Sequence, residues 1–391
     1  MRKFISYICE MLFNQIIGQE HIKNHLQTSA KNGRIPHAQL FIGKEGSGTL
    51  PMAIAYAQFL LSHFSDNPEA SELKVSKLQH PDLHFAFPVT TNDSVKKHPV
   101  SNLFLQEWRD FIENHPYGSL FNWLRFIGVE NKQGLIGVDE ALEVVKKLQL
   151  KSYEGGFKVM IIWMAEKMNI AASNKLLKLI EEPPEKTIFL LITENENQII
   201  NTIKSRCQAL HFPVLSEQDI ANALIQREQA SENDALKIAH QAEGNFNKAL
   251  HLLHQDSSDI VFEKWFITWI RSAFKAKGNA AVIQELVVWS ETIAKTGRET
   301  QKQFLEYCLQ FFRQALLLNY KSPDLVFLET QTPKFDLQNF APFVHSENIL
   351  AIEKEISEAM YHIERNGNAK IILLDLSMKL TRFLHKKEAK V

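Results

Sequence analysis

The chain has 391 residues, of which 45% are hydrophobic, so two or three domains with their own cores are expected. A formal net charge of −1 excludes a strong overall basic field, so any contact with nucleic acid must be local. Three widely separated cysteines exclude a zinc framework or a disulfide pattern and fit a reducing cytosol. No apolar run reaches the roughly 18–20 residues of a membrane span. We expect a cytoplasmic protein without a membrane segment.

The first half of the chain alternates short apolar runs with helical patterns. The apolar runs cover residues 38–42, 157–163, 187–193 and, more weakly, 208–212. Helical patterns cover residues 21–31, 138–150 and 171–182. Apolar runs of this length read as buried parallel strands, and their alternation with helices predicts a doubly wound α/β core.

A glycine-rich segment, residues 43–50, follows the first apolar run, and we call it the glycine loop. Gly43 and Gly48 have the spacing of the phosphate-binding motif G-x-x-x-x-G-K-[ST], with Gly46 between them. The lysine position holds Thr49, and the Mg²⁺-ligand position holds Leu50. The loop therefore lacks the charge that reaches the β- and γ-phosphates and one ligand of the metal. Taken alone, it is equally an ordinary turn between strand and helix.

Residues 66–134 are rich in His, Pro and Asn and predict an irregular insertion between strands. Within it, His80, Asp82 and His84 stand at alternating positions. They are weak candidates for metal ligands, because solvated histidines are common in such segments. We expect no metal site.

The second half of the chain is helical in pattern. Residues 215–255 predict a small helical module that Gly244 interrupts, and residues 256–391 predict long amphipathic helices. Three tryptophans in this last part are better explained by core or subunit packing than by base stacking, namely Trp265, Trp269 and Trp289.

Further segments accompany the glycine loop in a fixed order. Residues 13–20 precede the first helix, and residues 35–41 enter the first strand. Residues 171–184 combine an N-K-L-L-K-L helix with Glu-Glu-Pro-Pro, and Ser205-Arg206-Cys207 follows the next strand. Together these segments resemble the clamp-loader branch of the AAA+ proteins, and within it the delta-prime family of bacterial DNA polymerase III subunits. The acidic pair Glu181-Glu182 opposes the helix dipole and has no physical account in the sequence.

The resemblance covers roughly residues 13–255 and continues beyond them by helical pattern only. It implies a RecA-like AAA+ P-loop domain over residues 1–214, a helical lid over residues 215–255 and an all-α collar for oligomerisation over residues 256–391. The zinc module of many delta-prime relatives needs four cysteines, which this chain lacks.

Several departures from an active family member concern ATP hydrolysis. Met164 and Ala165 stand where the resemblance places the acidic residues for Mg²⁺ and water, and Glu166 follows them. Asn247 stands at the position of the lid arginine. With Thr49 and Leu50, these losses predict a subunit without a nucleotide cofactor or ATPase activity of its own.

Arg206 is the one nucleotide-facing residue that the family pattern keeps. The resemblance implies an arginine finger, flanked by Ser205 and Cys207, that acts on the ATP of a neighbouring subunit; the alternative is an ordinary surface arginine. The implied partners are tau/gamma and delta subunits and, through the complex, the sliding clamp and primer–template DNA. Polymerase activity would belong to the holoenzyme. The rival hypotheses are an active ATPase that uses Lys44 or Glu166, and an adaptor of another AAA+ complex.

Overall fold

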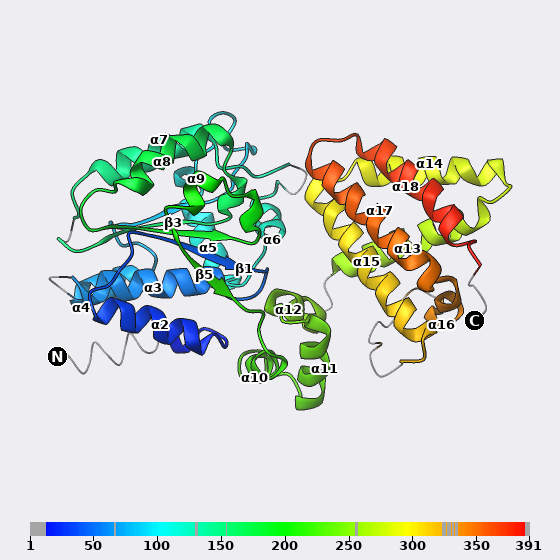
Figure 1. Ribbon diagram of the computed structural model, residues 1–391, viewed down its shortest axis with the longest axis horizontal. Coiled ribbons are helices and arrows are strands. Elements are labelled where there is room, and N and C mark those ends of the chain that lie inside the picture. The colour runs from blue at the N-terminus through cyan, green and yellow to red at the C-terminus, as the bar shows by residue number, and fades with distance from the viewer. Residues whose placement is uncertain are drawn as a thin grey trace. The chain divides into compact units, whose positions relative to one another are not determined.

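The structure is a computed structural model that describes residues 13–65, 68–129, 132–153, 155–254, 257–322, 326, 330, 332 and 335–387. It divides into two compact units, with the boundary between Leu253 and His254. Figure 1 draws both units with their helices and strands labelled, and each is described here by itself.

A five-stranded parallel sheet forms the centre of the first unit (Figure 1). The strands are β1 (Ala38–Gly43), β2 (Leu83–Ala86), β3 (Lys158–Ile162), β4 (Thr187–Thr193) and β5 (Gln208–Phe212). Their spatial order is β2-β3-β4-β1-β5. The register pairs Leu40 with Leu191 and Ile161 with Leu190. The predicted α/β fold with a parallel sheet is confirmed.

Helices cover both faces of this sheet, which is why its central strands are apolar without alternation. One face carries Phe41 and Leu190 and packs against α2 (Glu20–Lys31), α3 (Thr49–His63), α5 (Leu105–Asn114) and α6 (Leu120–Phe126). The other face carries Leu40 and Leu191 and packs against α7 (Val138–Gln149), α8 (Ile170–Glu181) and α9 (Asn201–Lys204). Successive residues of a strand therefore serve opposite layers.

The segment 66–134 differs from the irregular insertion that we expected. It contains α4 (Pro68–Ser76), edge strand β2, the short 3-10 helix η1 (Ser101–Phe104), α5 and α6. Trp108 of α5 is fully buried and stacks on Phe87 with 4.1 Å between ring centroids. The expectation of irregularity was wrong because a four-residue strand after Pro81 is too short to show a period.

Three helices follow the sheet within the first unit. They are α10 (Glu217–Glu228), α11 (Glu232–Ala242) and α12 (Phe246–His254). Ser216 and Ser231 cap the first two by accepting hydrogen bonds from backbone N–H groups of the first turn. A small core of their own, which includes Ile220, Leu224 and Phe246, holds these helices together. They occupy the range that the sequence predicts for the lid, and we call them the lid helices.

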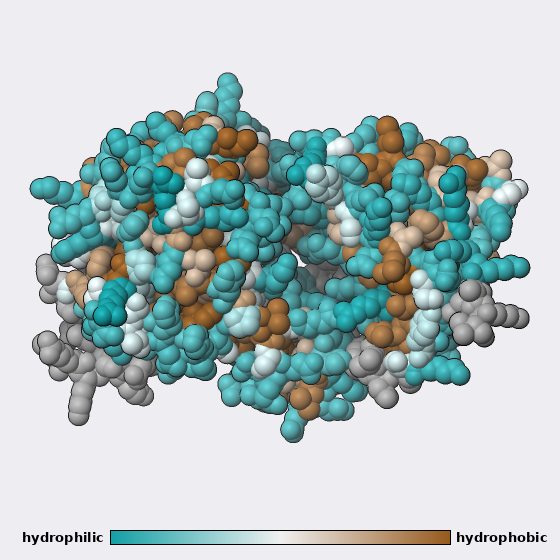
Figure 2. Space-filling model, viewed as in Figure 1, coloured by the Kyte–Doolittle hydropathy of each residue, from teal (hydrophilic) through white to brown (hydrophobic). Residues whose placement is uncertain are grey.

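The second unit is helical throughout its described residues. Its elements are α13 (Ser257–Lys275), α14 (Ala280–Ala294), α15 (Arg298–Asn319), α16 (Leu337–Phe340), the 3-10 helix η5 (Ala341–Phe343), α17 (Ser346–Glu364) and α18 (Ala369–Phe383). Trp269 and Trp289 stack in its core at 5.0 Å. On the face drawn in Figure 2, small groups of apolar residues lie between hydrophilic ones.

Among the residues that the structure describes, none of the helices combines the length and the apolar character needed to cross a bilayer.

Candidate functional site

The sheet topology places a switch point at the carboxyl ends of β1 and β4. These strands are neighbours, yet the chain leaves β1 for α3 on one face and leaves β4 for α9 on the other. In open α/β sheets, ligands bind at such a switch point. The glycine loop lies at the end of β1, and the segment after β3 ends beside β4. The glycine loop and the segment after β3 therefore lie at this edge of the sheet, whereas Arg206, which precedes β5, lies at the opposite edge.

Two glycines of the loop are required by its geometry. Gly48 immediately precedes α3 with a φ of 91°, a left-handed conformation that a side chain rarely adopts. A Cβ on Gly43 would lie 2.6 Å from Ser47 Oγ. The loop has kept the backbone shape of a phosphate-binding turn. Thr49 and Leu50 are 9% and 4% exposed, and Leu50 joins the core beneath α3.

The lid lies directly on the glycine loop. The backbone N–H of Phe246 donates to the Gly46 carbonyl at 3.3 Å. The Asn247 side-chain amide donates to Glu45 Oε1 at 2.8 Å, and the Asn245 amide does so at 3.3 Å. A Cβ on Gly46 would lie 2.0 Å from Asn245 Oδ1. We call these five residues the loop–lid clasp, because they join the lid helices to the glycine loop.

The acidic positions after β3 are apolar and tightly packed. Met164 adopts a left-handed φ of 54°, and Ala165 begins the 3-10 helix η2 (Ala165–Lys167). Glu166 accepts a hydrogen bond from the Glu194 N–H at 3.2 Å, while its other carboxylate oxygen is buried and has no hydrogen-bond donor among the described residues. Burial raises the pKa of the Glu166 carboxyl. A carboxyl that holds its proton more readily is a poorer ligand for Mg²⁺.

Arg206 lies between α9 and β5 and is held by its own chain. Its Nη1 donates to the Thr202 carbonyl at 2.9 Å, and its Nη2 forms an ion pair with Glu181 Oε2 at 3.0 Å. The Nε group is buried and has no acceptor among the described residues. The Arg206 side chain remains 32% exposed. Its guanidinium is thus docked against the end of α8 and still reaches the surface.

The neighbours of Arg206 support its backbone. Ser205 Oγ donates to the Thr202 carbonyl at 3.3 Å and closes the turn after α9. Cys207 packs against the core beneath α8. Burial raises the pKa of the Cys207 thiol to about 12, so it stays protonated and unreactive near neutral pH.

Of the alternating His80, Asp82 and His84, the first two make structural hydrogen bonds. Asp82 accepts hydrogen bonds from the Tyr153 N–H at 2.9 Å and from Ser152 Oγ at 3.1 Å. His80 Nδ1 accepts from the backbone N–H of Asp82 at 3.1 Å. Within the described part of the chain, no three His, Cys, Asp or Glu side chains gather closely enough to hold a metal ion.

We predict that His84 makes the first unit sensitive to acid. Burial, and then the charge of Lys147, lowers the pKa of His84 from 6.5 to about 4. The unfolded chain then binds a proton between these values and the folded chain does not, so stability is full above pH 6.5 and falls toward pH 4. His84→Gln should reduce this loss by on the order of 2 kcal/mol. Urea unfolding of both chains at pH 7 and pH 4.5 measures this loss in the free energy of unfolding.

The control for this prediction is His25→Gln, since His25 is exposed on α2. This variant should keep the acid sensitivity of the original chain. An unchanged pH dependence in His84→Gln would contradict the prediction.

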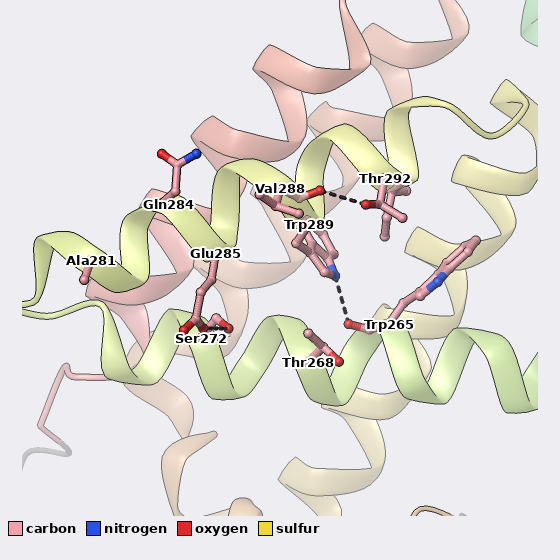
Figure 3. A pocket seen from close by; sticks show the side chains of 10 residues that line it. Trp265, Thr268, Ser272, Ala281, Gln284, Glu285, Val288, Trp289 and Thr292 are labelled. Atoms are coloured by element: carbon pink, nitrogen blue, oxygen red, sulfur yellow. Dashed lines mark hydrogen bonds between the residues drawn. The ribbon is translucent and has the colours of Figure 1, made fainter.

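A groove of about 530 Å³ lies between α13 and α14 in the second unit (Figure 3). The Trp289 indole N–H donates to the Trp265 carbonyl at 3.0 Å, and Ser272 donates to Glu285 Oε2 at 2.9 Å (Figure 3). Trp269 donates its N–H to Ser377 at 2.8 Å. The tryptophan N–H groups of Trp269 and Trp289 thus serve helix packing, as predicted from sequence.

A family model described as "DNA polymerase III, delta subunit" matches residues 18–216, which is just over half of the chain. The chain belongs to this family. The match spans the glycine loop, the helix α8 and Arg206, so the segments that carried the resemblance are the ones that the family shares. The predicted relationship to DNA polymerase III subunits is therefore confirmed.

Several curated proteins are similar to part of this chain. DNA polymerase III subunit delta' of Bacillus subtilis is 28% identical over 54% of this chain and 52% of its own length. Subunit delta' of Escherichia coli is 35% identical over 33% of this chain and 38% of its own length. Subunit tau of Bacillus subtilis is 29% identical over 62% of this chain and 37% of its own length. The chain thus spans between about a third and a half of these relatives.

One solved structure that is similar to this chain is a DNA polymerase III gamma subunit-related protein from Thermotoga maritima. It is 15% identical, with 92% of this chain and 99% of that chain covered, at a TM-score of 0.36. The fold assignment rests on the strand order and on the place of the glycine loop in this chain.

Two features of the site were missing from the sequence reading. The clasp through Glu45 and Asn245 depends on contacts across about two hundred residues of chain, which no local pattern reports. The role of Glu181 was open because its partner Arg206 is 25 positions away. The signal that could have found it is a carboxylate at a helix C-terminus, where only a nearby cation makes it favourable.

Proposed function

We propose that this chain is the non-hydrolysing delta-prime subunit of a DNA polymerase III clamp loader. The observation that carries the proposal is the loop–lid clasp, which closes a glycine loop that has Thr49 and Leu50 in place of lysine and hydroxyl. In this proposal the chain assembles in the cytoplasm with tau/gamma and delta subunits. The assembly loads the sliding clamp onto primer–template DNA.

Several losses of binding free energy add together to disfavour ATP. A missing lysine and a missing metal ligand each remove charge-assisted contacts worth about 1.5–3 kcal/mol. The Glu45 carboxylate adds a like charge beside the position of the phosphates. Entry of a nucleotide would also require the hydrogen bonds of Asn245 and Asn247 to break. Together these effects lower affinity by several orders of magnitude.

Arg206 gives the subunit its chemical role in this proposal. A guanidinium is always charged and offers planar pairs of donors that match phosphate oxygens. Arg206 is partly exposed between α9 and the start of β5, at the edge of the sheet opposite to the glycine loop. Since the chain's own glycine loop lies at the other edge of the sheet, the proposed target is the γ-phosphate on a neighbouring ATPase subunit. The finger would offset charge that develops in phosphoryl transfer.

The rival hypothesis of an unorthodox active ATPase finds less support. Glu166 is buried, and its raised pKa favours the protonated carboxyl over a metal ligand. Lys44 is exposed at the start of the glycine loop rather than on α3. Neither residue replaces the lysine and the hydroxyl that are missing from the first turn of α3.

The purified chain should show no heat of binding on titration with Mg-ATP at micromolar concentration. The matched variant Thr49→Lys with Leu50→Thr restores the two motif residues but leaves the loop–lid clasp intact. We expect it to remain far weaker than a working site, because the clasp still covers the loop. A tight, Mg²⁺-dependent isotherm for the original chain would contradict the proposal.

Assembly separates the proposal from an adaptor role in another AAA+ complex. The full chain, mixed with tau/gamma and delta subunits, should elute as one complex in size-exclusion chromatography. That complex should load a sliding clamp onto primed DNA only when this chain is present. Co-purification from cells with a different AAA+ ring, and without these subunits, would favour the adaptor.

A further inference from the structure

The contacts of Arg206 within its own chain point to a function for the acidic end of α8. The guanidinium uses Nη1 for the Thr202 carbonyl at 2.9 Å and Nη2 for Glu181 Oε2 at 3.0 Å. A phosphate bound by Arg206 would need hydrogen bonds from the same two nitrogens. An arginine that must reach a γ-phosphate on another subunit therefore has to leave or share its contact with Glu181.

We propose that Glu181 is a docking carboxylate that holds Arg206 on its own subunit until a neighbour's γ-phosphate replaces it. The inference rests on the proposed function of Arg206 as a finger. Glu181 occupies the last position of α8, where the helix dipole disfavours a carboxylate. The contact with Arg206 offsets that cost. A carboxylate in this position is thus best explained by the arginine that it holds.

The strength of the contact suits a reversible device. Glu181 is 52% exposed and Arg206 is 32% exposed, and ion pairs in such surroundings are weak. A γ-phosphate with its greater negative charge can therefore displace the carboxylate. At the same time, the contact with Thr202 keeps the guanidinium close to the surface. The ion pair delays engagement of the finger without preventing it.

Glu182 provides a matched control on the same helix end. It is adjacent to Glu181, carries the same charge and is exposed, while the ion pair joins Arg206 to Glu181. Both Glu181→Gln and Glu182→Gln remove one negative charge from the same surface. Only the first removes the docking contact.

The first experiment uses the free, isotope-labelled full chain and nuclear magnetic resonance of the arginine side chains. Rotation about the guanidinium bonds of Arg206 should be slow in the original chain. It should become several-fold faster in Glu181→Gln and stay unchanged in Glu182→Gln. Equal rotation rates in all three would overturn the docking contact, whatever the function of Arg206.

The second experiment measures ATP turnover of the reconstituted clamp loader against ATP concentration. The contribution of the site that Arg206 serves is taken as the difference from the Arg206→Ala complex. Release from Glu181 precedes binding to the phosphate, so Glu181→Gln should lower KM about twofold to fivefold with kcat unchanged. Glu182→Gln should leave both constants unchanged.

The outcomes distinguish a failure of the docking function of Glu181 from a failure of the finger function of Arg206. A fall in kcat with KM unchanged, or no change at all in Glu181→Gln, would overturn the docking function of Glu181. Full activity of the Arg206→Ala complex would instead refute the finger on which the inference rests. In the Arg206→Ala background, the Glu181→Gln substitution should have no effect on turnover.

Discussion

Arg206→Ala should nearly abolish turnover at one ATP site of the reconstituted clamp loader. Arginine fingers contribute about 10³–10⁵ in rate, which corresponds to about 4–7 kcal/mol of barrier. The drop in total ATPase will be smaller, because other ATP sites in the assembly receive their arginines from other subunits. Clamp- and DNA-stimulated ATP hydrolysis by complexes that carry the original chain or the variant measures the effect.

Two comparisons make the Arg206 experiment specific. Arg206→Lys keeps the positive charge but loses the planar pair of donors, so it should not restore the rate. The free Arg206→Ala chain should unfold close to the original chain, because the side chain is partly exposed and its ion pair is weak. Turnover at the original rate at every ATP site would leave Arg206 with a structural role only.

Trp108→Ala should destabilise the first unit by about 3–5 kcal/mol. The indole is fully buried and contacts Phe87, Trp123 and Trp163, with ring centroids 4.1, 5.1 and 5.0 Å away. Its loss would leave a cavity that these rings cannot fill. Denaturant unfolding, followed by a probe confined to the first unit, measures the change, because a chain of two units need not unfold in one step.

Trp108→Phe is the matched control for this substitution. It keeps an aromatic ring in the stack and removes an indole N–H that is buried without an acceptor among the described residues. Its cost should therefore be clearly smaller than that of alanine. A cost below about 1 kcal/mol for Trp108→Ala would match a surface position. It would indicate that the segment 66–134 is an insertion that contributes little to the core of the first unit.

The long, apolar elements of the first unit were predictable from sequence. The strand β4 is a continuous apolar run, and α8 was recognisable because two prolines follow its last turn. The edge strand β2 escaped notice because it has four residues and includes His84. A polar side chain in so short a run hides the strand. Only pairing with β3 identifies it.

In the candidate site, too, local motifs were predictable from sequence and long-range contacts were not. The loss of the motif lysine and hydroxyl at Thr49 and Leu50 was predictable from sequence, because the motif has a fixed spacing. The clasp that covers them was not visible, because Glu45 meets Asn247 only after the chain has folded. The ion pair of Glu181 with Arg206 belongs to the second kind. Sequence spacing reports local chemistry, whereas partners that meet across the fold need coordinates.

The loop–lid clasp has a consequence for how the subunit responds to metabolic state. A ligand shifts a conformational equilibrium only by its difference in affinity between the two forms. Hydrogen bonds between protein groups already join Gly46 to Phe246 and Glu45 to Asn247. In the proposed function no nucleotide binds at the glycine loop, so the closed lid would not respond to the ratio of ATP to ADP. A neighbouring subunit would meet the same lid surface before and after each hydrolysis event, which makes this unit a fixed reference against which the others move.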